Sequence, residues 1–228
     1  MEIKAPYHLG IIMDGNRRWA KKHGQGLLKG HSEGVDKVKK IGRLCRKLGV
    51  KILTLYTFST ENWKRPKREV NYLVNLVKES LNDENVKELN DEGIKVVVIG
   101  QKNRFSDDVR EVLDKAENIT KGNQKGILNI ALSYGGREEI VEAVKRIIKK
   151  RIAPEKVTED TISDNLWIQK DPDLIIRTSG EKRLSNFLTW QSAYSELYFT
   201  DKYWPDFEEE DLKNAFLEYT RRRRRFGK

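Results

Sequence analysis

The sequence predicts an α/β fold: a single domain with a central, mainly parallel six-stranded sheet flanked by helices. Three observations support this. Six short apolar runs alternate with amphipathic stretches, which is typical of parallel strands joined by crossover helices. The length of 228 residues suits one domain, and no repeat, low-complexity linker or internal boundary divides the range 1–228. An apolar fraction of 37%, with 16 glycines, excludes a disordered chain.

The six apolar runs are predicted to be buried strands. They are rich in Ile, Val, Leu and aromatic residues, and each ends near a turn-forming or polar residue. They occupy residues 8–14, 51–58, 94–100, 127–134, 173–178 and 196–200.

Helices are predicted between these strands. In the range 34–48, Val35, Val38 and Ile41 begin an i, i+3, i+4 stripe that Gly49 ends. Similar stripes predict further helices at 70–81 with an extension to 89, at 109–119, at 140–152 and from 212 to 219.

Four segments rich in polar or cationic residues follow predicted strands. In parallel α/β sheets the ligand crevice lies beyond the carboxyl ends of the strands. The segments are, in chain order, 14–18, 59–65, 134–137 and 177–185. We therefore expect the functional site to be built from them.

The formal net charge of +10 indicates an anionic partner, but its distribution is uneven. Residues 221–228 hold six cations and no acid, so the other 220 residues carry 39 − 35 = +4. Much of the excess therefore belongs to a basic C-terminal tail.

Several classes of protein are disfavoured. No G-x-G-x-x-G, P-loop or G-x-S-x-G motif occurs. The single cysteine, Cys45, excludes an intramolecular disulfide or a cysteine-based metal cage. No apolar run is long enough to span a membrane, and the N-terminus does not resemble a signal peptide, so we expect a cytoplasmic protein.

The first segment combines an acid, a glycine and two arginines. Gly15 lets a ligand approach the backbone, and Arg17 and Arg18 open a predicted helix. The Arg18 guanidinium can bind phosphate oxygens in a fork, whereas Asp14 repels phosphate unless Mg²⁺ lies between them. The segment predicts a phosphate site with a divalent cation; alternatively, Asp14 only caps the helix and the arginines are solvated.

The second and fourth segments offer further polar groups, each with a structural alternative. In the second segment, many polar residues lie beside Trp63, and this pattern predicts a ligand-binding loop. Alternatively, the segment is a capped loop in which Trp63 packs on the core. Arg177, Arg183 and Ser185 surround a turn that suits a diphosphate, or else they form a surface turn. Glu196 is a second acid available to a metal ion. His31, just before a predicted helix, is more often structural than catalytic.

Together, these motifs resemble the cis-prenyltransferase family, whose best-known members are undecaprenyl diphosphate synthases. The resemblance runs in order along nearly the whole chain. It rests on residues 8–16 (HLGIIMDGN), Trp19, 30–31 (GH), 56–63 (YTFSTENW), 65–66 (RP), 134–137 (YGGR), 176–180 (IRTSG), 183–188 (RLSNFL), 190–191 (WQ) and 195–200 (SELYFT). It implies a homodimeric enzyme that condenses an allylic prenyl diphosphate with isopentenyl diphosphate, forms cis double bonds and uses Mg²⁺.

The resemblance also implies roles for individual residues. Asp14 would be catalytic through its bound Mg²⁺, and Glu196 would complete the metal site. The allylic diphosphate would contact Gly15, Asn16, Arg17, Arg18, Trp19 and His31. A segment between the two substrates, on the allylic side, would contain Ser59, Thr60, Glu61, Asn62, Trp63 and Arg65, with Asn62 orienting substrate as a catalytic residue. Isopentenyl diphosphate would be held by Arg177, Arg183, Leu184 and Ser185.

Two positions depart from the family pattern. Many members have an arginine at the position of Leu27, and the resemblance implies that Arg17, where those members have glycine, compensates for it. Lys182 replaces a histidine that is often found there.

The resemblance implies two further features outside the diphosphate sites. An apolar tunnel for the prenyl chain is expected between the sheet and the helix at 70–81, with Lys78, Glu79 and Ser80 on its outer face. The tail 221–228 is expected to contact the partner subunit, and a long lipid product implies transient contact with a membrane surface.

Two interpretations compete with the enzyme. A noncatalytic partner subunit is disfavoured because this chain keeps the catalytic set of residues. Nucleic-acid binding by the arginine tail has no recognised motif in support, so no nucleic-acid partner is expected. The preferred allylic donor, the product length and the pathway served do not follow from the sequence.

Overall fold

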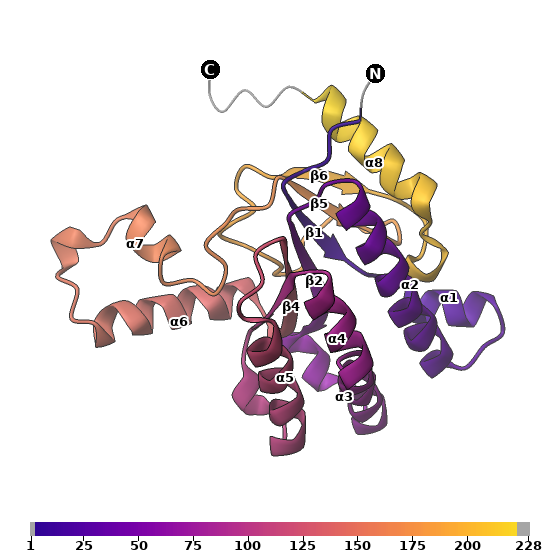
Figure 1. Cartoon of the computed structure of the whole chain (residues 1–228), viewed down its shortest axis with the longest axis horizontal. Coiled ribbons are helices and arrows are strands. Elements are labelled where there is room, and N and C mark those ends of the chain that lie inside the picture. Colours follow the sequence, from indigo (N-terminus) through magenta and orange to yellow (C-terminus); the bar gives the residue numbers. More distant parts are fainter. Residues whose placement is uncertain (1–2, 223–228) are drawn as a thin grey trace.

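The computed structural model describes residues 3–222 and has the predicted α/β architecture (Figure 1). Its six strands, all within the predicted ranges or one residue outside them, are β1 His8–Ile12, β2 Ile52–Ser59, β3 Ile94–Ile99, β4 Gly126–Tyr134, β5 Leu174–Arg177 and β6 Glu196–Phe199. The helices are α1 Asn16–Lys22, α2 Leu27–Lys47, α3 Lys67–Ser80, α4 Asp83–Asp91, α5 Asp107–Thr120, α6 Gly136–Lys149, α7 Glu159–Ser163 and α8 Glu209–Arg221. A short 3₁₀ helix at Thr60–Lys64 follows β2.

The strands form one sheet in the order β3-β4-β2-β1-β5-β6, and every neighbouring pair is parallel. The prediction of a mainly parallel sheet is thus confirmed, and the described sheet is entirely parallel. Because all strands run the same way, the loops after β1, β2, β4 and β5 leave from one edge of the sheet, which we call the carboxyl edge. The opposite edge is the amino edge.

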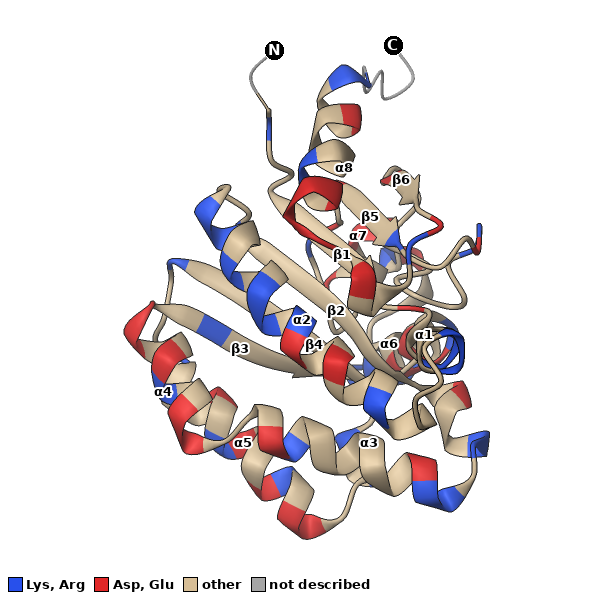
Figure 2. Ribbon diagram, turned by 90° about the vertical axis from the view of Figure 1, so that its right-hand side faces the viewer, with Lys and Arg blue, Asp and Glu red and all other residues tan. Residues whose placement is uncertain are grey.

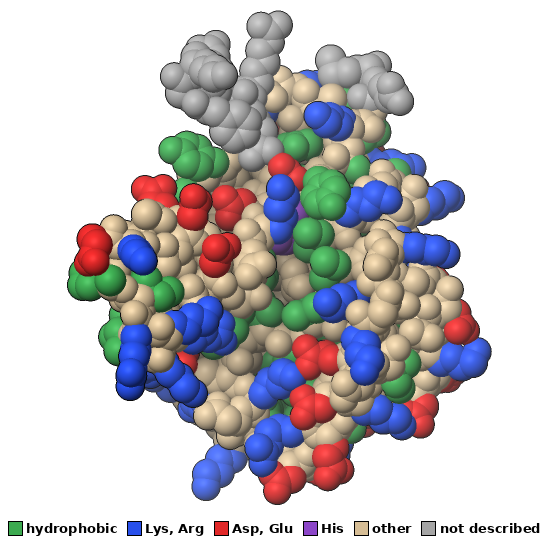
Figure 3. All heavy atoms as spheres, turned by 60° about the vertical axis from the view of Figure 1, so that its left-hand side comes forward, with side chains coloured by type: hydrophobic (Ala, Val, Ile, Leu, Met, Phe, Trp, Pro, Cys, Tyr) green, Lys and Arg blue, Asp and Glu red, His purple; other side chains and the backbone are tan. Residues whose placement is uncertain are grey.

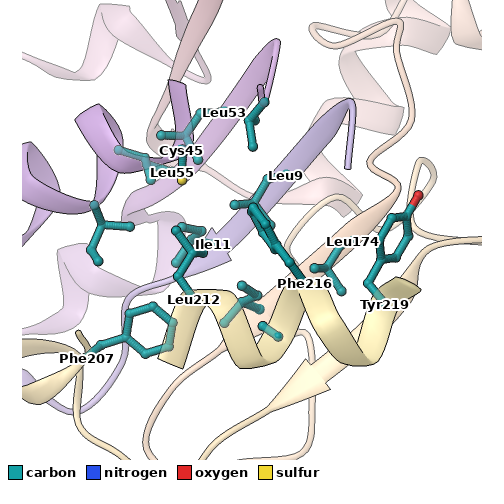
Figure 4. Close-up of a cluster of buried hydrophobic side chains, with 14 of the residues drawn as sticks. Leu9, Ile11, Cys45, Leu53, Leu55, Leu174, Phe207, Leu212, Phe216 and Tyr219 are labelled. Carbon is teal, nitrogen blue, oxygen red and sulfur yellow. The ribbon is translucent and has the colours of Figure 1, made fainter. Parts of the chain in front are cut away.

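The two faces of the sheet are covered differently. Leu9 of β1, Leu53 of β2 and Leu174 of β5 share one face, on which residues of α2 and α8 pack (Figure 4). Residues of α3, α4 and α5 cover the same face over β3 and β4. The other face packs against Phe187 and Leu188 and their neighbours in the chain after α7. The apolar stripes of the helices therefore face the sheet, as their periodicity predicts.

Helix α2 begins seven residues earlier than predicted, at Leu27 rather than at residue 34. The residues added, 27–33, contain a glycine and several polar side chains, so they carry little apolar periodicity. Tertiary packing explains the glycine, because a Cβ at Gly30 would lie 2.1 Å from the carbonyl oxygen of Asn16. His31 consequently lies inside a helix, and the prediction that it precedes one is wrong.

The predicted extension of the 70–81 helix to residue 89 is also wrong. The chain leaves helical geometry at Leu81, and the Asn82 side chain caps a separate helix by accepting a hydrogen bond of 2.9 Å from the Asn85 amide. Asparagine favours this N-cap position because its side chain satisfies an otherwise free amide. Within residues 3–222, no helix is long and apolar enough to cross a membrane.

Candidate active site

The first, second and fourth polar segments meet in one pocket at the carboxyl edge of the sheet. Asp14 and Asn16 line it after β1. Ser59 lines it at the end of β2 and Asn62 just after that strand, and Arg177 lines it at the end of β5. Among the described residues, its charged lining consists of one acid and five cations: Asp14, Arg17, Arg18, Lys21, Arg65 and Arg177. Figure 2 shows the concentration of Lys and Arg on α1, the helix that supplies Arg17, Arg18 and Lys21 to this lining. This charge balance favours an anionic ligand.

Asp14 lies at the centre of the ionic contacts in this pocket. One carboxylate oxygen accepts a hydrogen bond of 2.7 Å from the Gly15 amide. The other lies 2.8 Å from Arg177 Nη2 and 3.3 Å from Arg18 Nη2. Burial raises the pKa of Asp14, but its bond to Arg177 and the charges of Arg177 and Arg18 outweigh this and hold that pKa below its usual value. Asp14 is therefore ionised.

Arg177 joins the pocket to the turn that follows β5. Its side chain is buried, and Nη1 donates to the Arg183 carbonyl at 2.5 Å and to Ser185 Oγ at 2.7 Å. Its Nε is buried without a hydrogen-bond partner among the described residues. Because Arg177 lines the pocket and carries a positive charge into it, this residue suits an oxygen-rich anion.

The turn itself is held in an unusual backbone conformation. Ser185 and Asn186 have positive φ angles of 49° and 67°. The third polar segment supports them, because the Gly136 amide donates 2.7 Å to the Asn186 carbonyl and the Arg137 amide donates 2.9 Å to Asn186 Oδ1. A Cβ at Gly136 would lie 2.3 Å from Thr189 Oγ1, so only glycine fits there. The third segment thus shapes the turn rather than lining the pocket.

Arg18 spans from α1 to the segment after β5. It donates to the Ser179 carbonyl at 3.2 Å and to Ser179 Oγ at 2.5 Å, and it lies 3.0 Å from Glu181. Glu181 also contacts Arg183 at 2.5 Å. Arg183 is well exposed and, like Leu184, lies outside the pocket lining. Glu181 therefore pairs with one arginine from each predicted diphosphate site.

His31 belongs to a second ionic cluster at the α2–α3 side of the pocket. Its Nε2 lies 3.3 Å from Glu69, a buried acid on α3. Glu69 also contacts Arg65 at 2.9 Å and Arg17 Nε at 3.9 Å. Burial lowers the pKa of His31, while its bond to Glu69 partly offsets this. Glu69 positions three predicted allylic-site residues, and the i, i+4 spacing from Arg65 is the signal that would have found it.

The second polar segment divides between the pocket and the core. The Ser59 amide donates 3.0 Å to Asn62 Oδ1, and both residues line the pocket. Trp63 instead donates 2.9 Å to Ser133 Oγ and packs on the neighbouring ring of Phe58. For Trp63, the structure therefore matches the structural alternative, in which this side chain packs on the core.

Three other residues from the predicted sites lie outside the pocket lining. Thr60 and Glu61 lie beyond it, and Glu61 accepts 3.3 Å from Asn186 Nδ2. The Trp19 indole Nε1 donates a hydrogen bond of 2.6 Å to Asp206 Oδ1. Only part of each predicted segment thus faces the ligand space.

Glu196 lies away from Asp14 within this chain. It begins β6 and is paired in register with Leu174, the first residue of β5, so it lies at the amino edge. Its carboxylate contacts Arg222 at 2.9 Å. One chain therefore does not bring Glu196 and Asp14 to a common metal site. Arg221 and Arg222 are described, and the rest of the predicted tail, 223–228, lies outside the described residues.

The pocket's donor groups suit a divalent cation that binds together with a ligand. Residues 3–222 contain no group of three or more metal-ligating side chains, and Asp14 is the one acid among those lining the pocket. Mg²⁺ commonly takes one or two carboxylates and completes its shell with substrate phosphates and water. A single ionised carboxylate among cations fits a Mg²⁺ ion that arrives with a diphosphate.

A largely apolar cavity of about 220 Å³ lies beside the pocket, between the sheet, α2, α3 and α4. The two share six residues: Met13, Asn16, His31, Tyr56, Thr57 and Leu73. Leu76, Val77 and Leu81 are among its apolar lining. Ser80 lines the cavity too, so its expected place on the outer face is wrong.

Comparison with known proteins identifies the family of a chain that has this cationic pocket and this apolar cavity. The model of the undecaprenyl diphosphate synthase family matches residues 12–227. This chain belongs to that family. Its enzymes are prenyltransferases, and so is this protein.

Individual relatives agree over almost the whole chain. An isoprenyl transferase of Bacillus cereus is 52% identical over 228 residues, covering 97% of this chain and 88% of that protein. One from Streptococcus thermophilus is 50% identical, covering 97% and 93%. The crystal structure of lavandulyl diphosphate synthase from Lavandula x intermedia, in complex with dimethylallyl diphosphate, is 38% identical with a TM-score of 0.94 and full coverage of both chains.

Proposed function

We propose that this prenyltransferase carries out Mg²⁺-dependent cis elongation, condensing isopentenyl diphosphate onto an allylic prenyl diphosphate to make a polyprenyl diphosphate carrier-lipid precursor. One observation supports the proposal: a cationic pocket adjoins a largely apolar cavity, and six residues line both. A prenyl diphosphate has the same two parts, an anionic head and a hydrocarbon tail.

The chemistry follows from the arrangement of the cations. Cleavage of the allylic C–O bond leaves negative charge on the departing diphosphate, which preorganised guanidiniums such as that of Arg18 stabilise. Asp14 would hold Mg²⁺, which would supply further charge neutralisation when bound. Arg177, which bonds to Ser185 and lines the pocket, holds the second diphosphate, so that the two substrates are oriented for bond formation.

Asn62 orients substrate in this proposal. Its side-chain oxygen already accepts from the Ser59 amide, which leaves its amide N–H groups as donors for the pocket. A neutral amide is a poor base, so the proton lost in condensation goes to a diphosphate oxygen or another nearby group.

Homodimerisation and transient contact with a membrane surface remain part of the proposal. Large apolar side chains are exposed at Val141, Val144 and Ile148 on α6 and at Tyr194. Figure 3 shows a face on which single apolar side chains lie among charges of both signs. In a homodimer, the basic tail would approach the neighbouring subunit's pocket, and the cytoplasmic enzyme would release its lipid product into a bilayer.

The test is a condensation assay with purified full-length protein, Mg²⁺ and labelled isopentenyl diphosphate. C10, C15 and C20 allylic diphosphates are supplied in turn, with and without detergent. We expect extended products from at least one donor, loss of product in EDTA, and recovery when Mg²⁺ is restored. Absence of extended product with every donor would contradict the elongation proposal, and full activity in EDTA would contradict the metal role.

A further inference from the structure

Asn186 joins three segments at the carboxyl edge of the sheet. It follows Ser185, which lines the pocket, in the turn after β5. Its backbone carbonyl accepts a hydrogen bond of 2.7 Å from the Gly136 amide, and its Oδ1 accepts one of 2.9 Å from the Arg137 amide at the start of α6. Its Nδ2 donates 3.3 Å to Glu61 Oε1 in the 3₁₀ helix after β2. One short side chain therefore connects parts of the chain that are far apart in sequence.

Glu61 lies outside the pocket lining but between two residues that line it. Ser59 precedes it and Asn62 follows it, and the Ser59 amide donates to Asn62 Oδ1, so these residues form one hydrogen-bonded turn. Burial raises the pKa of Glu61, but hydrogen bonds from its own amide and from the Ser59 and Asn186 side chains hold that pKa below its usual value. The Asn186 amide thus donates to an ionised acceptor, which makes a stronger bond than a neutral one.

The backbone beside this bond is closely packed. A Cβ at Gly135 would lie 2.6 Å from Asn186 Nδ2 and 2.9 Å from Thr60 Oγ1, so the Gly135 backbone lies against both segments. Other bonds anchor Ser185 to the strands, because Tyr56 of β2 donates 3.3 Å to its carbonyl and its hydroxyl accepts from the end of β5. The bond made by Asn186 is the one that fixes the turn relative to the 3₁₀ helix.

We propose that Asn186 is a positioning residue for isopentenyl diphosphate, and that it acts by fixing Ser185 relative to the segment that contains Ser59 and Asn62. This inference rests on the proposed elongation function, in which the turn at Ser185 holds one diphosphate while Asn62 orients substrate. The spacing of the two segments then sets how the two reactants meet. Asn186 is not among the described residues that line the pocket, so it acts through its neighbours.

The key experiment measures the KM of each substrate for the unchanged chain and for Asn186→Asp. Aspartate has the size of asparagine, tolerates a positive φ and keeps an oxygen for the Arg137 amide, so this variant is expected to fold. It replaces the donor to Glu61 with a second carboxylate, which repels the first. The KM for isopentenyl diphosphate should rise about 10-fold, and the KM of the allylic donor less than about 2-fold.

Glu61→Ala breaks the same hydrogen bond from the other side, at an exposed residue whose loss the fold should tolerate. The resemblance to the family implies that Glu61 contacts the allylic diphosphate, and losing such a contact would raise the KM of the allylic donor. The positioning role of Asn186 predicts instead that the KM for isopentenyl diphosphate rises, as in Asn186→Asp.

A double variant and a matched control separate positioning from general stability. Glu61→Gln combined with Asn186→Asp rebuilds the bond with donor and acceptor exchanged, so its KM for isopentenyl diphosphate should be lower than that of Asn186→Asp alone. Asn123 Nδ2 donates 3.2 Å to Asn90 Oδ1 and 3.0 Å to the Ile94 carbonyl, at the amino edge. Asn123→Asp should therefore cost stability without changing either KM, and thermal unfolding is measured for every variant.

Each result has a definite meaning. A selective rise in the KM for isopentenyl diphosphate in both single variants, with recovery in the double variant, supports the inference. Equal rises for both substrates, a rise for the allylic donor alone, unchanged KM values in folded and active variants, or no recovery in the double variant overturn it while leaving elongation intact. Absence of extended product from the unchanged chain overturns elongation and this inference together.

Discussion

Two sets of polar side chains in the same sheet have opposite surroundings. At the carboxyl edge, Asp14 and Arg177 form an ion pair and line an open pocket. Inside the sheet, His8 Nε2 lies 2.7 Å from Thr54 Oγ1, to which Asn129 Nδ2 donates at 2.9 Å. Burial lowers the pKa of His8 to about 4, although bonds to the Lys170 and Asp171 backbone oppose this, so the ring is neutral near pH 7.

The difference shows how to separate residues that catalyse from residues that hold the fold. The buried set satisfies its own hydrogen bonds and has no access to a ligand, so its removal should cost stability. The carboxyl-edge set pairs cations with a lone carboxylate beside open space, so its removal should cost activity. Four experiments test this division, from the largest expected effect to the smallest.

Replacing Asp14 with alanine should lower turnover about 10³-fold, because the one acid among the pocket's described lining residues is lost. Arg177 keeps its bonds to Arg183 and Ser185, so the chain should stay folded. Turnover and thermal unfolding are measured together. Asp14→Asn, which keeps the size but not the charge, is the control and should be equally inactive. Retained turnover in either variant would show that Asp14 does not bind the metal.

Lowering the pH should destabilise the protein through His8. The unfolded side chain takes up a proton below its ordinary pKa of 6.5, whereas the folded one does so only near 4. The contribution of His8 to the free energy of unfolding should therefore be largest above pH 6.5. It should decrease by about 3 kcal/mol as the pH drops toward 4.

Urea unfolding between pH 7 and pH 4.5 measures this effect, with His8→Gln as the control that lacks the titrating ring. His31, whose pKa is also lowered, contributes a decrease of the same sign in both proteins. An equal decrease in the unchanged chain and in His8→Gln would show that His8 is not responsible.

Truncating Arg177 to alanine should raise the KM for isopentenyl diphosphate about 30-fold, which corresponds to about 2 kcal/mol for a lost charged hydrogen bond. The KM for the allylic donor should change little. Arg177→Lys keeps the charge without the fork and should recover only part of the loss. If the KM for the allylic donor rises instead, the assignment of the two substrates to the two diphosphate sites is reversed.

The smallest effect is expected for Arg17→Ala. Arg17 is about half exposed, at 52%, so losing its contact with the allylic diphosphate should raise the donor's KM about 5-fold, or about 1 kcal/mol. Leu27, which also lines the pocket, offers a rescue: adding Leu27→Arg should restore donor binding if Arg17 substitutes for the missing arginine. A normal KM in Arg17→Ala would show that its charge is not used.

Much of this site could be predicted from the sequence because its parts follow strands. The six apolar runs set the strands, and parallel pairing brings their ends to one edge, so Asp14, Asn62 and Arg177 were expected together and lie around one pocket. Glu69 was missed although its i, i+4 spacing from Arg65 is visible in the sequence, because an acid in the first turn of a helix is equally well explained by the helix dipole.

The sequence by itself thus determined the strands, the polar strand ends and the family to which the chain belongs. Tertiary structure alone decided which way each side chain faces. It turned Trp63 onto the core, extended α2 back to Leu27 against α1, and placed Glu196 at the amino edge with Arg222. The physical reason is that local patterns record periodicity and propensity, whereas direction depends on contacts between segments far apart in the chain.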